Sequence, residues 1–145
     1  MQELESITEC CKSYQCSILL REPLAKHTTF RIGGACRAMI QISSREGLQA
    51  ILRCCQDQHL PWMVLGNGSN ILAADEGYDG IVLQLGRSFS RVQLLDETTV
   101  FCEAGATLSA VGKFALEVCL TGMECLAGIP GTIGGAVYMN AGAYG

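Results

Sequence analysis

The sequence is 145 residues long, carries 10 basic against 14 acidic side chains for a formal net charge of −4, and is 49% hydrophobic. This length fits one domain or a piece of a larger one, and such a hydrophobic content argues against disorder. The basic residues, three lysines and seven arginines, are scattered along the chain. They form no contiguous positive stretch, which disfavours nucleic acid as a partner.

The nine cysteines are an odd number, include two adjacent pairs and form no CxxC motif. This spacing fits neither a disulfide framework nor a zinc site, so we interpret them as reduced thiols that pack as small apolar residues. The acidic, polar N-terminus does not resemble a signal peptide. The uncharged stretch 125–145 is too rich in glycine for a membrane span. We expect a cytoplasmic protein without a membrane association, and nothing implies a specific protein partner.

The first predicted elements are a helix and a strand. Apolar residues at helical spacing predict a short amphipathic helix over 3–13, followed by an extended link through Pro23. Residues 36–42 predict a strand. Ser43 and Glu46 then have the spacing of a capping box, which marks the start of the next helix.

That next helix is predicted over 45–58 from a stripe of apolar residues at intervals of three and four. A compact apolar run at 62–65 predicts a buried strand, whose carboxyl end leads into the loop GNGSN at 66–70. A strand, helix and strand unit therefore precedes this loop.

Three short runs with the composition of strands follow, at 81–85, 90–95 and 100–103. They favour an antiparallel or mixed sheet over continued alternation of strands and helices. A second amphipathic helix is predicted from Leu108 and ends before Gly122.

The loop GNGSN is the first candidate binding site, because ligands of α/β sheets commonly bind where a strand ends. Its glycines would let the backbone approach a phosphate, and successive N–H groups would form an anion nest. The loop matches neither the dinucleotide-binding fingerprint nor a Walker loop. An ordinary tight turn is the alternative interpretation. The candidate residues are Gly66, Asn67, Gly68, Ser69 and Asn70.

The second candidate is the glycine-rich segment GIPGTIGGAVYMNAGAYG at 128–145. Its glycines would remove side chains along one surface, so that a flat ligand could lie against the backbone. Thr132, Tyr138 and Asn140 would supply directed hydrogen bonds. The alternative is a loop packed against the sheet.

The segment HTTFRIGG at 27–34 is a weaker signal, since Arg31 could meet a phosphate or simply cap a surface. The two histidines, His27 and His59, are isolated, and we interpret them as surface or capping residues. No HExxH or GxSxG motif and no evident acid and base pair occurs. Binding loops without catalytic groups are expected where a cofactor carries the reactive atoms.

Four segments together resemble the UDP-N-acetylenolpyruvoylglucosamine reductase (MurB) family, over about residues 20–145. In chain order they are HTTFRIGG, VLGNGSNIL, AGATL and LAGIPGTIGGAVYMNAGAYG. The last of them is similar to the type II branch. Cys36, Arg37 and the number of cysteines depart from the family's pattern.

The resemblance implies an α+β fold, the FAD-binding domain of the vanillyl-alcohol-oxidase (PCMH-type) fold, in which two α/β subdomains clasp FAD. Residues 1–20 would form an N-terminal helix and link, 21–75 the first α/β subdomain and 76–145 part of the second. The chain ends inside a glycine-rich motif with no terminating element. We therefore expect a truncated protein that lacks its substrate-binding domain.

The resemblance also implies two groups of cofactor contacts. The first would hold the FAD pyrophosphate, and the second would line the rest of the flavin cofactor. The first group is Gly66, Asn67, Gly68, Ser69, Asn70 and Ile71, and the second is Pro130, Gly131, Thr132, Gly134, Gly135, Tyr138, Asn140 and Gly142.

The implied activity is FAD-dependent reduction of an enolpyruvyl UDP-sugar to UDP-N-acetylmuramate, with NADPH as hydride donor, in peptidoglycan precursor synthesis. The family's catalytic residues lie beyond NAGAYG, so no catalytic residue is assigned in this chain, and the chain alone should be inactive. We also expect no metal site. The alternatives are another FAD oxidoreductase of the same fold or a non-catalytic nucleotide-binding module. Gly134→Val is expected to abolish FAD binding while leaving most of the fold intact.

Overall fold

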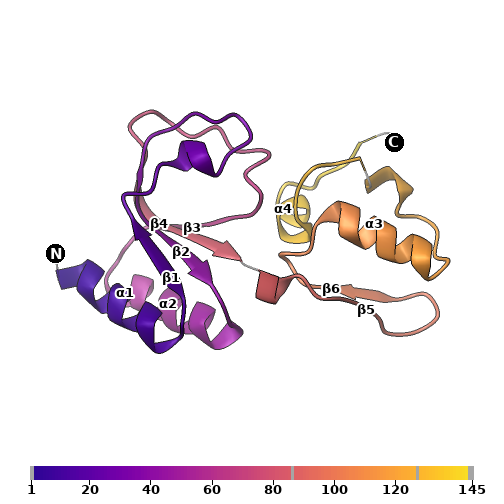
Figure 1. Ribbon diagram of the computed structural model, residues 1–145, viewed down its shortest axis with the longest axis horizontal. Helices are drawn as coiled ribbons and strands as arrows, with labels where there is room; N and C mark the ends of the chain where they lie inside the picture. Colours follow the sequence, from indigo (N-terminus) through magenta and orange to yellow (C-terminus); the bar gives the residue numbers. More distant parts are fainter. Residues whose placement is uncertain (1, 86, 127, 144–145) are drawn as a thin grey trace. The chain divides into compact units, whose positions relative to one another are not determined.

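The computed structural model describes residues 2–85, 87–126 and 128–143. Residues 144 and 145, the end of the motif NAGAYG, lie outside the described residues. The chain divides into two compact units, unit 1 at Met1–Gly86 and unit 2 at Arg87–Gly145 (Figure 1). The sequence suggested a division at 75/76. The observed division falls later because strand β4 (Tyr78–Leu85) pairs with unit 1 strands on both of its sides.

Unit 1 contains one mixed sheet of four strands in the order β1-β2-β4-β3. The strands β2 (Cys36–Ile42) and β3 (Trp62–Leu65) both run parallel to β4, which lies between them. Strand β1 (Ser17–Leu20) is antiparallel to β2 and forms one edge. The run at 81–85 is therefore part of a central strand of this mixed sheet. The sequence grouped it with the two later runs in one antiparallel or mixed sheet, whereas only those later runs pair with each other, as an antiparallel hairpin.

The two faces of this sheet are covered differently. Met39 and Val82 are paired in register and pack in a core cluster with Leu24 and Ala73, which come from the long loops. Alternate strand residues point to the other face. On that face lie α1 (Gln2–Ser13) and α2 (Arg45–Asp57), which contact each other (Figure 1). The loops that cover the first face carry the GNGSN motif.

Most elements of unit 1 agree with the sequence, but the cap of α2 does not. The side chain of Ser44 accepts a hydrogen bond from the Gly47 N–H at 3.0 Å, so Ser44 is the N-cap. The hydroxyl of Ser43 instead donates to the Tyr14 carbonyl at 2.8 Å. The predicted capping box is wrong by one residue, because Ser43 is held by the turn that follows α1.

Strands β1 and β3 also differ from expectation. Strand β3 was predicted to be buried, but it is an edge strand in which Trp62 is 42% and Val64 is 50% exposed. Strand β1 lies in the segment interpreted as an extended link. A half-buried strand is recognised by alternating apolar and polar residues. Strand β1 lacks this alternation, because Leu19 and Leu20 are apolar although both are exposed.

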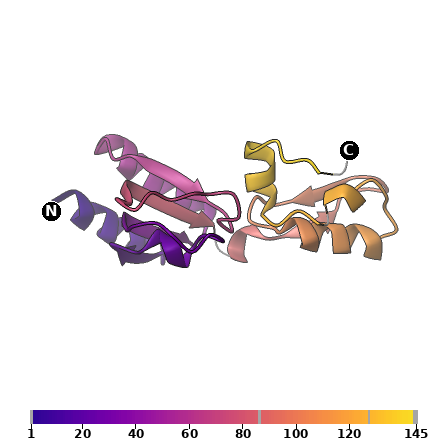
Figure 2. The same cartoon turned by 90° about the horizontal axis from the view of Figure 1, so that it is seen from above.

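Unit 2 combines a hairpin with two helices, α3 (Leu108–Glu117) and α4 (Ile133–Tyr138), as Figures 1 and 2 show. The hairpin pairs β5 (Val92–Leu94) with β6 (Val100–Cys102) in antiparallel register. Helix α3 was predicted, whereas α4 was not. The two helices begin side by side, because their N-caps Thr107 and Thr132 form an isolated bridge.

Within the described residues, no helix combines the length and the apolar character that crossing a membrane requires. The cysteines differ in their exposure. Cys11, Cys16, Cys36 and Cys55 are buried, as their interpretation as packing residues requires, whereas Cys119 and Cys125 are exposed.

Alkaline pH is expected to destabilise unit 1 through two of these thiols. Burial raises the pKa of Cys11 to about 12 and that of Cys55 to about 11, from an ordinary value of 9.0. The unfolded chain ionises its thiols above pH 9.0 while the folded chain does not. The free energy of unfolding therefore keeps its full value below pH 9.0. It falls as the pH rises towards and through the pKa values that Cys11 and Cys55 have in the folded chain. Urea unfolding followed by Trp62 fluorescence should give a lower midpoint at about pH 10.5 than at about pH 8. Cys11→Ala should shrink this difference, and an unchanged difference would contradict the assignment.

Candidate functional site

The GNGSN loop, residues 66–70, begins directly after β3 and packs against the loop that contains HTTFRIGG. The Thr29 N–H donates to the Gly68 carbonyl at 3.0 Å. Gly68 has a φ of +64°, and a Cβ placed there would overlap the His27 carbonyl oxygen. Gly68 is therefore required by the contact between two protein loops. This packing accounts for the glycine without a ligand, and the close approach of a phosphate at this position stays a prediction.

The GNGSN loop nevertheless presents unpaired donors. Among the described residues, the backbone N–H groups of Asn67, Gly68 and Asn70 donate no backbone hydrogen bond. The Asn67 and Asn70 side chains are exposed, while Gly68 is buried. Successive unpaired N–H groups in a turn form a nest for an anion. Anion binding by this loop stays a prediction, and the packing against His27 gives Gly68 a reason of its own for being glycine.

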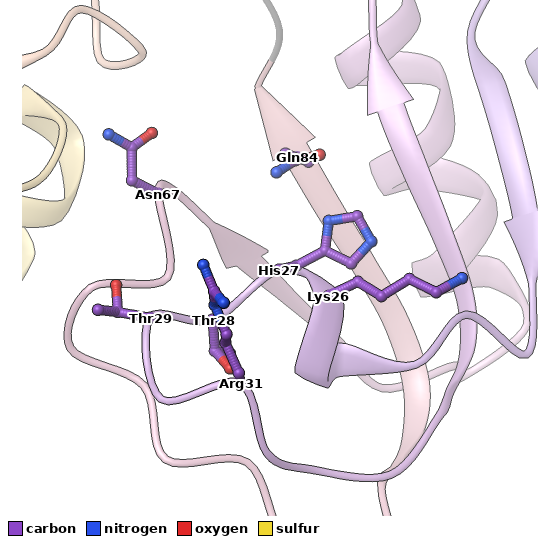
Figure 3. A pocket seen from close by; sticks show the side chains of 7 residues that line it. All are labelled: Lys26, His27, Thr28, Thr29, Arg31, Asn67 and Gln84. Carbon is purple, nitrogen blue, oxygen red and sulfur yellow. The ribbon is translucent and has the colours of Figure 1, made fainter.

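A hollow of about 500 Å³ lies beside this loop (Figure 3). It is lined by Lys26, by residues 27–29 and Arg31 of the HTTFRIGG loop, by Asn67 and by Gln84 of β4. We call it the basic hollow. Figure 3 shows the His27 ring near Gln84, with Lys26 extending away from Asn67. The sequence treated Arg31 as a weak signal and gave no role to Lys26 or Gln84. The cluster of basic and hydroxyl residues at 26–31 was the feature of the sequence from which these lining residues could have been found.

The charges around the basic hollow are not evenly compensated. The Glu22 carboxylate lies 3.0 Å from His27 Nε2 and 3.4 Å from Lys26 Nζ. The hydrogen bond with His27, followed by that with Lys26, holds the pKa of Glu22 below its usual range. Within the part of the chain that the structure describes, no ion pair is formed by Arg31. Arg31 is thus a basic side chain of this hollow without a carboxylate partner among the described residues.

In unit 2, the start of the second candidate segment is fixed by hydrogen bonds inside the unit. Thr132 Oγ1 accepts from the Gly135 N–H at 3.3 Å and caps α4. The N–H groups of Ile133 and Gly134 donate to the carbonyls of residues 106 and 104, both at 2.8 Å. Thr132 is also buried. The Thr132 oxygen thus serves the helix as an acceptor, while a hydrogen bond from its hydroxyl to a ligand stays a prediction.

Gly134 also has an internal reason to be glycine. A Cβ at this position would lie 2.9 Å from the Ala104 Cβ and 3.1 Å from the Ala104 carbonyl oxygen. Gly134 therefore faces protein and not an open surface. The expectation that Gly134→Val adds bulk only toward a ligand is wrong, because the added side chain would meet the segment before α3.

The later part of the same segment is open. Val137 is 77% and Tyr138 88% exposed, and Asn140 adopts a left-handed φ of +47°. A Cβ at Gly142 would have no neighbouring heavy atom within 4 Å. Of the predicted contacts in this unit, Pro130, Gly135, Tyr138, Asn140 and Gly142 are exposed, whereas Gly131 and Gly134 are half-buried and Thr132 is buried. The exposed apolar side chains of this later part would give a planar ligand a surface to lie against.

Open amide donors after a strand and an exposed aromatic and glycine surface are features of a domain that binds a nucleotide cofactor. Residues 36–145 match the family known as the FAD binding domain, and the chain belongs to this family.

Comparison with curated proteins identifies closer relatives. The chain is 40% identical over 139 residues to the UDP-N-acetylenolpyruvoylglucosamine reductase of Heliobacterium modesticaldum, covering 96% of this chain and 44% of that protein. It is 41% identical over 128 residues to the enzyme of the same name from Clostridioides difficile, covering 88% of this chain and 42% of that protein. The resemblance seen in the sequence is confirmed. The chain spans less than half the length of these relatives.

Solved structures support the predicted fold class. MurB from Thermus caldophilus matches with a TM-score of 0.67 and 35% identity, over 88% of this chain and 43% of that chain. A p-cresol methylhydroxylase matches with a TM-score of 0.60 over 83% of this chain and 26% of that chain, at 13% identity, which speaks for the fold alone. The expected α+β fold of an FAD-binding domain is thus confirmed.

Proposed function

We propose that this chain supplies the FAD-binding part of an NADPH-dependent reductase that converts an enolpyruvyl UDP-sugar to UDP-N-acetylmuramate. The observation that carries the proposal is the identity of 40 to 41% to reductases of that name over 88 to 96% of this chain, together with membership of the FAD binding domain family. The reaction belongs to the synthesis of peptidoglycan precursors. We also propose a cytoplasmic location for the protein.

The residues of unit 1 fit the diphosphate of such a cofactor. The N–H groups of Asn67, Gly68 and Asn70 provide donors without protein acceptors among the described backbone groups. Backbone donors in a rigid turn bind phosphate oxygens without a large entropic cost, because the turn is already ordered. The hydrogen bond from Thr29 to Gly68 provides that order.

The residues of unit 2 fit the aromatic ring system of such a cofactor. The exposed side chains at 137–139 and the open position at Gly142 supply a surface against which a flat ring can lie. FAD, when bound, would take hydride from NADPH and deliver it to the enolpyruvyl double bond. The residues of this chain would bind and orient the cofactor, while Thr132 and Gly134 would keep α4 in place.

The proposal predicts saturable binding of FAD by the chain. Trp62 is the only tryptophan, is 42% exposed and lies four residues before Gly66 on β3, so its fluorescence should respond to FAD. A titration should be followed both by this fluorescence and by flavin absorbance. Trp62→Phe is the control: it should lose the fluorescence response and keep the absorbance response.

A sample with the circular dichroism of a folded α/β protein that binds no FAD in either readout would contradict the proposal. Binding in both readouts would support it. If FAD binds but Trp62 fluorescence does not respond, flavin absorbance will still change. If FAD does not bind, neither signal will change.

A further inference from the structure

The GNGSN loop contains no charged side chain. A diphosphate linkage carries two negative charges at neutral pH, whereas backbone N–H groups contribute only partial positive charges. Walker loops meet this need with a lysine of their own. If unit 1 holds the diphosphate of the proposed function, on which this inference rests, the full positive charge must come from another segment.

Arg31 is brought to the GNGSN loop by contacts that fix the two loops together. The Thr29 N–H binds the Gly68 carbonyl at 3.0 Å, two residues before Arg31. The Gly68 backbone also packs on the His27 carbonyl, so closely that it leaves no room for a Cβ. Arg31 and Asn67 then line the same basic hollow from opposite loops. Their proximity is therefore a property of the folded unit and not of two independent loops.

Among the basic side chains of the basic hollow, Arg31 has no carboxylate partner within the described residues. Lys26 and His27 share the Glu22 carboxylate, at 3.4 and 3.0 Å. Thr28 is buried, and its hydroxyl donates to the Ile32 carbonyl at 3.4 Å, so it is already engaged. The exposed Thr29 and Asn67 side chains remain as neutral donors beside Arg31.

We infer that Arg31 is the charge partner of the cofactor diphosphate, a residue that makes this site select phosphate-bearing flavins. The guanidinium of Arg31 pairs with phosphate oxygens across the basic hollow, while the GNGSN amides bind them from the other side. A guanidinium forms two parallel hydrogen bonds with a phosphate, which gives direction as well as charge. HTTFRIGG and GNGSN are then two halves of one phosphate site.

The test compares Arg31→Gln with Arg21→Gln in the whole chain. Arg21 is a matched control, because it is exposed, has a φ of +52° against +56° at Arg31, and does not line the basic hollow. Both variants lose one positive charge and place glutamine in the same strained backbone region. The affinity for FAD should fall about tenfold or more in Arg31→Gln and stay within about twofold in Arg21→Gln.

Three further probes separate the effect of the Arg31 charge from an effect on the structure. Riboflavin carries no phosphate, so any affinity for it should be the same in Arg31→Gln as in the unmodified chain. Arg31→Lys keeps the charge and should recover a substantial part of the FAD affinity. Inorganic pyrophosphate, titrated by calorimetry, should bind the unmodified chain more tightly than Arg31→Gln.

The outcomes distinguish this inference from the proposed function. FAD binding that is equal in Arg31→Gln, Arg21→Gln and the unmodified chain would overturn the role of Arg31 and leave the proposed function standing. Pyrophosphate binding that depends on Arg31, without FAD binding, would support the phosphate site and count against the proposed function. Absence of both would overturn both.

Discussion

Gly68→Ala should lower the stability of unit 1 by more than about 2 kcal/mol and abolish detectable FAD binding. A Cβ at this position would overlap the His27 carbonyl oxygen, and the backbone has a φ of +64°. The obstacle is backbone, which cannot rotate away as a side chain can. The GNGSN loop would therefore have to move off the HTTFRIGG loop, which breaks the bond from Thr29 and separates Asn67 from Arg31. Urea unfolding by Trp62 fluorescence and an FAD titration measure the two effects.

Gly68→Asn separates the two causes of this effect. Asparagine tolerates a left-handed backbone better than other residues with a Cβ, because its side chain forms local hydrogen bonds. If strain alone required glycine, Gly68→Asn would recover most of the stability. Since the overlap with His27 is the same for any Cβ, we expect Gly68→Asn to be about as unstable as Gly68→Ala. Recovery by asparagine would show that the two loops do not pack as described.

The elements that sequence predicted correctly are those whose pattern is local. The helix over 45–58 and the strand at 36–42 follow from apolar periodicity, and α2 and β2 occupy these positions almost residue for residue. Helix α3 likewise follows from its apolar stripe. Helix α4 was missed, because two adjacent glycines lower the helix propensity of its sequence. It forms because Thr132 and the carbonyls before α3 satisfy its first N–H groups.

The candidate site could be located from sequence but not explained by it. The glycine patterns indicated where another group lies close to the backbone. They do not indicate whether that group is a ligand or another part of the protein. At Gly68 the approaching group is His27, and at Gly134 it is Ala104, which is 30 residues earlier in the chain. The importance of Arg31 depends on the same long-range packing, since only the folded loop brings it to Asn67. Contacts of this kind have no local signature.

Gly134→Val should destabilise unit 2 by about 2 kcal/mol, as overpacking of a filled contact commonly does. The Cβ alone would lie 2.9 Å from the Ala104 Cβ, and valine adds two methyl groups in a short helix whose second N–H binds the Ala104 carbonyl at 2.8 Å. Loss of FAD binding in this variant would follow from displacement of α4. Thermal unfolding monitored by circular dichroism should therefore show a lower midpoint for the unit 2 transition.

Gly142→Val is the matched variant, because a Cβ at Gly142 meets no heavy atom within 4 Å. We expect it to unfold like the unmodified chain. If the open surface after α4 lies against the flavin, valine at this position should still weaken FAD binding about tenfold, because its bulk occupies the space of the ring. A stable Gly142→Val that binds FAD normally would remove Gly142 from the cofactor contacts. A stable Gly134→Val would contradict the packing of α4 on Ala104. The pair thus separates a glycine required by the fold from a glycine required by the ligand.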